Sequence, residues 1–127
     1  MFKFNMNPTD EYERLAEFFK ANGVAMGEGT LLKAWKITQA EDFLVAGLVF
    51  GENDGKFYVL GLAVDRILRK FGLGKILINK AKDEAKKRGG NGLYVLTSVP
   101  EFFLKKGFSY EAEGRTENGP FLMKTDL

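Results

Sequence analysis

Apolar residues recur at helical spacing near the start of the chain, over residues 7–23. They share one face of the predicted helix and are Tyr12, Leu15, Phe18 and Phe19. Asn7 is expected to cap this helix, Pro8 suits its first position, and Gly23 is expected to end it. The segment therefore predicts an amphipathic helix that packs against the rest of the chain.

Three apolar segments follow, at residues 31–38, 43–52 and 56–64, and each has the composition of a β-strand. The tripeptide at 53–55, Asn-Asp-Gly, is a hairpin signal between the second and the third. The third segment is almost continuously apolar, which is typical of a strand buried on both faces. We expect these strands to form an antiparallel meander.

The pattern changes after the third strand. A helix is predicted over residues 72–88, with charged residues around most of its surface. Its apolar side consists of Ile76, Leu77, Ala81 and Ala85. The glycine-rich segment 89–92 ends this helix, and residues 93–97 have the composition of another buried strand. Strand, helix and strand in this order form a βαβ crossover, so the strands at 56–64 and 93–97 should be parallel.

A short helix is predicted after the 93–97 strand, with Ser98 at capping-box spacing from a glutamate. Two more strands are predicted at 108–112 and 120–125. Together these elements predict the α+β (mixed α/β) class, with a mostly antiparallel mixed sheet, one central parallel step, and helices on both faces. We take residues 1–127 as a single domain, because the length suits one core.

Composition supports a folded domain and removes several classes of chemistry. Apolar residues make up 45% of the chain and aromatic residues 13%, which favours a packed core. With 19 basic and 17 acidic residues, the charge balance does not suggest a nucleic-acid binder. The chain has no Cys and no His, which excludes thiolate and Ser-His-Asp catalysis and makes a metal site unexpected. Proton transfer then falls to Asp, Glu, Tyr or Lys side chains, a chain terminus or water.

The hydrophobic segments do not suggest a membrane partner. Charged residues near the N-terminus stand where a signal peptide needs an apolar block. The longest apolar run, residues 43–50, is far too short to span a bilayer. We expect a soluble, cytoplasmic protein.

Two glycines, Gly72 and Gly74, lie where the predicted crossover helix begins. The first amides of a helix lack internal partners, and the helix dipole adds about half a positive charge there. Because glycine has no β-carbon, an anion can approach such amides closely. Arg69, Lys70 and Lys75 add positive charge around the same point. The segment is therefore either a glycine-rich turn with solvated bases or a site for a phosphate or diphosphate group.

The spacing Arg-x-x-Gly-x-Gly from Arg69 to Gly74, preceded by Leu-Ala-Val at 62–64, resembles the acetyl-coenzyme A signature of the GNAT N-acetyltransferase superfamily. The likeness extends to residues 94–108, and the order of elements agrees over nearly the whole chain. Within 94–108, Leu-Thr followed by a Phe-Phe pair is most similar to the small N-acetylglutamate-synthase-like branch. That branch usually has an arginine where this chain has Leu60, so the difference favours a less charged acceptor over an acidic amino acid.

The resemblance implies an enzyme that moves an acetyl group from acetyl-CoA to the primary amine of a small molecule or peptide, by direct attack in a ternary complex. Acetyl-CoA is the implied co-substrate, and no metal is implied. The amides of residues 69–75 would hold the diphosphate, and the exposed edge of the 56–64 strand would pair with pantetheine. The implied cofactor-binding residues are Leu62, Ala63, Val64, Arg69, Lys70, Phe71, Gly72, Leu73, Gly74, Lys75, Phe102 and Phe103. A homodimer is compatible with the resemblance, since many relatives dimerise through their C-terminal strands.

Two positions depart from the family pattern. Tyr58 stands where many members have a glutamate base, so Tyr58 is the candidate catalytic residue, relaying a proton through water or else shaping the acceptor pocket. Phe103 stands where many members have a tyrosine that protonates the leaving thiolate. Phenylalanine cannot donate, so we expect Phe103 to pack beside pantetheine or in the core. A coenzyme A thiol has a pKa near that of free cysteine, roughly 8.5, so the thiolate can leave with little help.

Two other hypotheses remain open. A non-catalytic acyl-CoA-binding or sensing module on the same fold would bind the cofactor without turning over any amine. The basic residues of the crossover helix could also form a nucleic-acid face. The acidic residues between them and the missing aromatic platform count against that second hypothesis.

Overall fold

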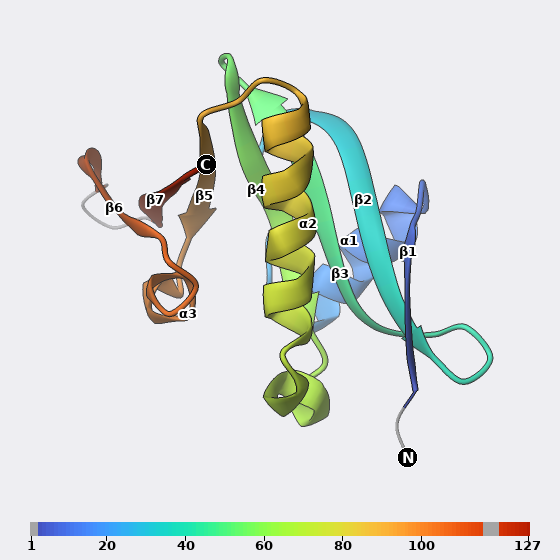
Figure 1. Ribbon diagram of the computed structural model, residues 1–127. Coiled ribbons are helices and arrows are strands. Elements are labelled where there is room, and N and C mark those ends of the chain that lie inside the picture. The colour runs from blue at the N-terminus through green and yellow to red at the C-terminus, as the bar shows by residue number, and fades with distance from the viewer. Residues whose placement is uncertain (1–2, 116–119) are drawn as a thin grey trace.

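Seven strands form one twisted sheet with helices on both of its faces (Figure 1). The computed structural model describes residues 3–115 and 120–127, with the backbone alone for residues 112–115. The strands are β1 (Phe4–Pro8), β2 (Thr30–Gln39), β3 (Phe43–Asn53), β4 (Lys56–Val64), β5 (Gly92–Thr97), β6 (Ser109–Arg115) and β7 (Phe121–Asp126). The helices are α1 (Tyr12–Ala21), the 3-10 helix η1 (Arg66–Phe71), α2 (Leu73–Lys87) and α3 (Pro100–Leu104).

The strand order is β1-β2-β3-β4-β5-β7-β6. Strands β1 to β4 form an antiparallel meander, and β7 lies between β5 and β6 with antiparallel pairing on both sides. Strands β4 and β5 are parallel and are joined through α2. The predicted mixed sheet with a central parallel step is thus confirmed.

The β3–β4 hairpin turns at Asp54 and Gly55, whose φ angles of 53° and 77° are both positive. Two positive φ angles define the type I′ turn, whose twist matches that of the flanking strands. The turn sets the register of β4 against β3 from Asn53–Lys56 to the Ala46–Val64 pair.

Strand β4 carries a bulge at Leu60, where its register with β3 shifts by one residue. Leu60 and Gly61 therefore both face α1, and a β-carbon on Gly61 would lie 2.4 Å from the Phe19 ring. Beyond the bulge the alternation is reversed, so that Leu62 and Val64 join the core on the α2 face. The bulge thus sets which side chains of the last residues of β4 face α2, next to the predicted site.

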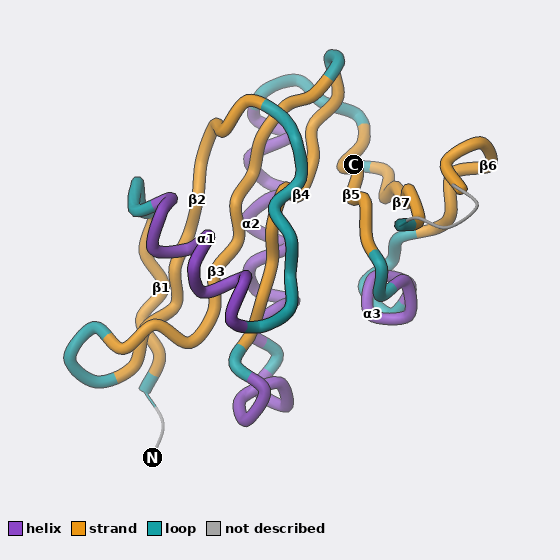
Figure 2. Tube along the Cα trace, turned by 180° about the vertical axis from the view of Figure 1, so that it is seen from behind, coloured by secondary structure: helices purple, strands orange, loops and turns teal. Residues whose placement is uncertain are grey.

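Each face of the sheet has its own core. Leu77, Ile78 and Ala81 of α2 are buried on one face, while Leu15 and Phe19 of α1 are buried on the other. Figure 2 shows α1 lying across the near face of the sheet, where it contacts β3 and β4. In the described part of the chain, no helix is long and apolar enough to cross a membrane.

The N-terminal segment differs from the prediction. Asn7 and Pro8 belong to β1, which pairs with β2, and the helix begins only at Tyr12. Pro8 is tolerated because β1 is an edge strand and Pro8 is its last residue. The hydroxyl of Thr9, not the side chain of Asn7, accepts a hydrogen bond from the Glu11 amide at 3.1 Å.

Two further local predictions are wrong. Ile76 is 43% exposed, and Leu73 and Ile78 complete the buried stripe of α2 instead. Ser98 does not cap α3, because the residue before that helix is Val99, whose amide is bound by the Thr97 hydroxyl at 3.0 Å.

Candidate active site

Strands β4 and β5 pair over only a short stretch. Their parallel ladder covers Phe57–Val59 against Leu93–Val95, and it ends there although both strands continue. Figure 1 shows the strands diverging toward their carboxyl ends, where η1 and α3 follow. The carboxyl half of β4 is thus hydrogen-bonded to β3 on one side and separated from β5 on the other.

The backbone groups of Leu62 and Val64 point toward this gap between the strands. The Asp65 amide donates to the Val45 carbonyl at 2.8 Å, so every second residue back from Asp65 bonds to β3. Leu62 and Val64 are the alternate residues, and their amides and carbonyls face away from β3. The Val64 carbonyl accepts a hydrogen bond from Arg69 Nε at 3.2 Å, which fits this direction.

The start of α2 lies at the carboxyl end of β4. Gly72 has a φ of 72° and is exposed, and a β-carbon there would meet no atom within 4 Å. The first hydrogen bond into α2 runs from the Ile76 amide to the Gly72 carbonyl, at 3.2 Å. The amides of Leu73, Gly74 and Lys75 therefore have no carbonyl partner inside the helix, which is the arrangement that binds anions.

Positive charge surrounds this helix start. Arg69, Lys70 and Lys75 are exposed there, as their sequence positions predict. A further cation comes from the chain after α3, since Lys106 Nζ lies 5.2 Å from the centre of the Phe102 ring. Sequence reasoning missed Lys106, because only the fold brings the end of α3 next to the start of α2.

One aromatic side chain connects the two elements at the open end of the strands. A β-carbon on Gly74 would lie 2.9 Å from the Phe102 ring, which is too close, and 3.9 Å from the Val64 side chain. The neighbouring Phe103 is 5% exposed and packs edge-on against Phe102 and Phe108, with ring centres 5.0 and 5.2 Å away. Gly74 is therefore needed for packing in this structure, in addition to any role in binding.

The side chains of the remaining predicted residues lie in the core or against other strands of the sheet. The side chains of Leu73 and Ala63 are buried in the cores of the two faces. Phe71 turns its ring toward β1, where it lies 5.6 Å from the Phe4 ring. Tyr58 is half-buried on the α1 face, and its ring lies 5.6 Å from the Tyr94 ring of β5. Tyr58 thus lies one rung before the ladder ends.

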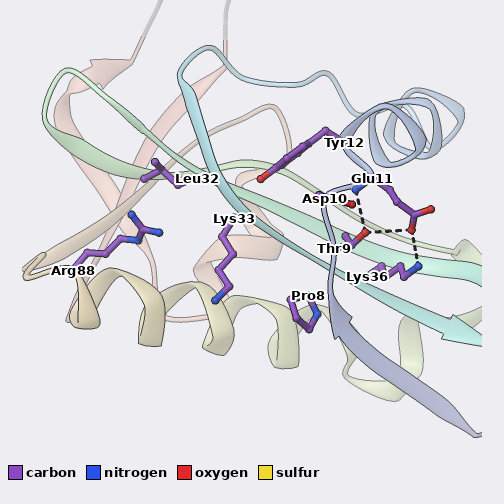
Figure 3. Close-up of a pocket in the computed structure, with 9 residues that line it drawn as sticks. All are labelled: Pro8, Thr9, Asp10, Glu11, Tyr12, Leu32, Lys33, Lys36 and Arg88. Atoms are coloured by element: carbon purple, nitrogen blue, oxygen red, sulfur yellow. Dashed lines mark hydrogen bonds and ion pairs between the residues drawn. The ribbon is translucent and has the colours of Figure 1, made fainter.

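A separate hollow of about 930 Å³ lies at the β1–β2 edge and contains none of the predicted site residues (Figure 3). Its cations already have partners: Lys36 binds Glu11, while Lys33 and Arg88 bind Glu84 at 3.5 and 2.8 Å. Burial raises the pKa of Glu84, but the hydrogen bond from Arg88 and the charge of Lys33 outweigh it and leave the pKa below its usual value. These contacts tie α1 and α2 to β2, and we interpret the hollow as structural.

Comparison with known proteins identifies the arrangement. Residues 4–108 match the model of the acetyltransferase (GNAT) family. The chain belongs to this family. Its members use acetyl-CoA, and the diverging strands followed by a glycine-rich helix start form the acetyl-CoA-binding fold. No curated protein sequence matches the chain.

Solved structures agree with the family at low sequence identity. A GNAT acetyltransferase from Staphylococcus aureus has a TM-score of 0.75 at 15% identity, covering 98% of this chain and 99% of that one. N-acetylglutamate synthase from Neisseria gonorrhoeae has a TM-score of 0.74 at 14% identity, covering 98% of this chain but 35% of that one. A GNAT N-acetyltransferase from Escherichia coli in complex with CoA has a TM-score of 0.70 at 16% identity, covering 99% and 82%. The synthase is thus one of several distant structural relatives of this GNAT protein.

Proposed function

We propose that residues 1–127 form a single catalytic domain that transfers an acetyl group from acetyl-CoA to a primary amine of a small molecule or peptide, by direct attack in a ternary complex. The observation that carries this proposal is that an open β4 edge and the exposed start of α2 lie next to each other. Each can bind a different part of one elongated ligand. Acetyl-CoA, when bound, supplies the activated acetyl thioester.

The chain offers groups that suit each part of this co-substrate. The amides at Gly72 to Lys75 and the cations around them would hold the diphosphate. The backbone of Leu62 and Val64 would pair with the pantetheine amides, as one strand pairs with another. A β4 amide that points at the thioester carbonyl would stabilise developing negative charge, a contribution of roughly 3–4 kcal/mol for one good donor.

Proton transfer would pass through Tyr58 and water. Its hydroxyl is the titratable group that β4 supplies beside the end of the ladder, and it can relay a proton away from the attacking amine. Carboxylates in loops and at strand ends are in other environments: Asp42 pairs with Arg14 at 3.0 Å, and Glu28, Glu41 and Glu52 are exposed. The burial of Phe103 supports a packing role for that residue. The leaving thiolate of coenzyme A would then take its proton from water.

Coenzyme A release with a panel of primary amines tests the proposal. Turnover of at least one amine, together with a Tyr58→Phe variant that keeps cofactor affinity but loses rate, would support it. Tight binding of acetyl-CoA without turnover of any amine would favour the sensing module instead.

Within the family, the Leu-Thr and Phe-Phe pattern of 94–108 leads us to place the chain nearest to the N-acetylglutamate-synthase-like branch.

A further inference from the structure

Beside Tyr58, the face of β5 and β7 that is turned away from α2 carries an aromatic and basic cluster. Tyr58, Tyr94 and Lys124 occupy one row across β4, β5 and β7, since Tyr58 is paired with Tyr94 and Tyr94 with Lys124. Lys56 lies two residues before Tyr58 on the same strand. On this side α1 lies against β3 and β4, and no described helix covers β5 and β7 (Figure 2). Lys56 is exposed, and Tyr94 and Lys124 are half-buried.

Both lysines are directed at the Tyr94 ring. Lys56 Nζ lies 5.2 Å and Lys124 Nζ 5.5 Å from the ring centre. Two ammonium groups thus approach one aromatic ring from different strands, and each is within the range of a cation–π interaction. Tyr94 in turn contacts Tyr58, so the cluster is continuous with the candidate catalytic residue.

The position of Lys124 is built into the sheet. A β-carbon on Gly92 would lie only 2.6 Å from Lys124 Cε. The aliphatic part of Lys124 therefore packs over Gly92 of β5, in space that a side chain at that position would fill. Interaction with Tyr94 and the hydrogen bond from Lys124 to Asp126 raise the pKa of Lys124, which therefore stays protonated at neutral pH. Asp126 is 88% exposed and 3.4 Å away, and an ion pair of this kind holds a lysine only weakly.

The position of Leu60 removes the reason for expecting a less charged acceptor. Leu60 is 4% exposed, and its side chain packs under the loop that contains Gly27 and Gly29. Its carbonyl accepts a hydrogen bond from the Gly27 amide at 2.7 Å. Leu60 therefore belongs to the core, and the charge of the neighbouring surface comes from Lys56 and Lys124.

We propose that Lys56 and Lys124 select acceptors in which the primary amine is linked to an anionic group, a carboxylate or a phosphate. This inference rests on the proposed acetyl transfer at the β4 edge. The last pair of the β4–β5 ladder, Val59 with Val95, lies one residue, or about 3.3 Å, beyond the Tyr58 row. A molecule of amino-acid size therefore reaches from an amine at the diverging strands to an anion between the lysines.

Matched pairs of amines test this selection, with thiol release as the readout. The pairs are phenylalanine with phenethylamine, lysine with cadaverine, and phosphoethanolamine with ethanolamine, so the carboxylate and phosphate arms are separate. We expect kcat/KM to be roughly 10- to 100-fold higher for the anionic member of at least one pair, the range of a charge-assisted hydrogen bond. Lys124→Gln and Lys56→Gln should reduce this preference mainly through KM, and Lys80→Gln on the exposed side of α2 should not change it.

Each remaining outcome has a definite meaning. Equal or better turnover of the members that lack the anionic group overturns the inference, as does a preference that survives the double variant of Lys56 and Lys124. Turnover of no anionic amine, with coenzyme A still bound, also overturns it. Failure of the unaltered protein to bind coenzyme A contradicts the proposed function on which the inference rests.

Discussion

Substitution of Gly72 separates anion binding from stability at the start of α2. Gly72 has a φ of 72° and a ψ of 19°, so Asn and Asp are the residues best suited to replace it. A new side chain meets no atom within 4 Å. The left-handed conformation costs both variants about 1 kcal/mol relative to glycine. Gly72→Asn is therefore the matched control for Gly72→Asp, since the two differ in charge alone.

The charge of Asp should act in opposite directions on stability and on binding. Without ligand, a carboxylate at a helix start is favourable by about 0.3–1 kcal/mol. The unfolding temperature of Gly72→Asp should therefore be slightly higher than that of Gly72→Asn. With a diphosphate about 5 Å away and an effective dielectric constant of about 40–80, each charge pair costs about 1–2 kcal/mol. Gly72→Asp should thus bind coenzyme A at least about tenfold more weakly than Gly72→Asn.

Isothermal titration calorimetry with coenzyme A, and thermal unfolding of the free proteins, provide the two measurements. The affinity difference should shrink as salt is raised, because the interaction is exposed and screened. Equal affinity for the two variants at low salt would refute a diphosphate site at Gly72.

Three further predictions concern the framework of the site. Glu84→Gln should cost about 0.5–1.5 kcal/mol of unfolding free energy at pH 7 through lost contacts to Arg88 and Lys33. Because the folded pKa of Glu84 is lowered, its contribution to stability is present above the unfolded pKa and disappears as pH falls through the folded pKa. The unfolding free energies of the two proteins in urea should therefore converge below about pH 4. A difference in unfolding free energy that is unchanged at that pH would contradict the pairing. Gly61→Ala should lose about 1–3 kcal/mol in urea unfolding, because the new β-carbon would lie 2.4 Å from the Phe19 ring, and an unchanged midpoint would argue against the bulge. Phe103→Leu should retain turnover while lowering Tm by a few degrees, and complete loss of rate with intact cofactor affinity would show that Phe103 takes part in the chemistry.

The fold was predictable where local chemistry and long-range packing agree. The Asn-Asp-Gly hairpin forms the expected turn at Asp54 and Gly55, and the crossover through α2 makes β4 and β5 parallel. The prediction failed at the N-terminus, where Asn7 has a good local role as a helix cap. Pairing of β1 with β2 wins there, since it satisfies several backbone groups at once.

The site was predictable in its backbone and less so in its side chains. The Arg-x-x-Gly-x-Gly spacing correctly located the helix start at Gly72. The packing of Phe102 over Gly74 depends on α3 returning to α2, which no local pattern reports. Strand β5 was expected to be buried on both faces, yet Leu96 is 52% exposed, because no described helix covers that side. The lysines around Tyr94 come from separate strands and were missed for the same reason.

Amide chemical shifts during a titration with coenzyme A report on the start of α2 and on the β4 edge in one experiment. In a ¹H–¹⁵N spectrum of the labelled protein, we expect the largest shifts at the amides of Gly72, Gly74 and Lys75, followed by those of Leu62 and Val64. Saturable binding whose largest shifts fall elsewhere, with these five amides unmoved, would contradict binding at this site.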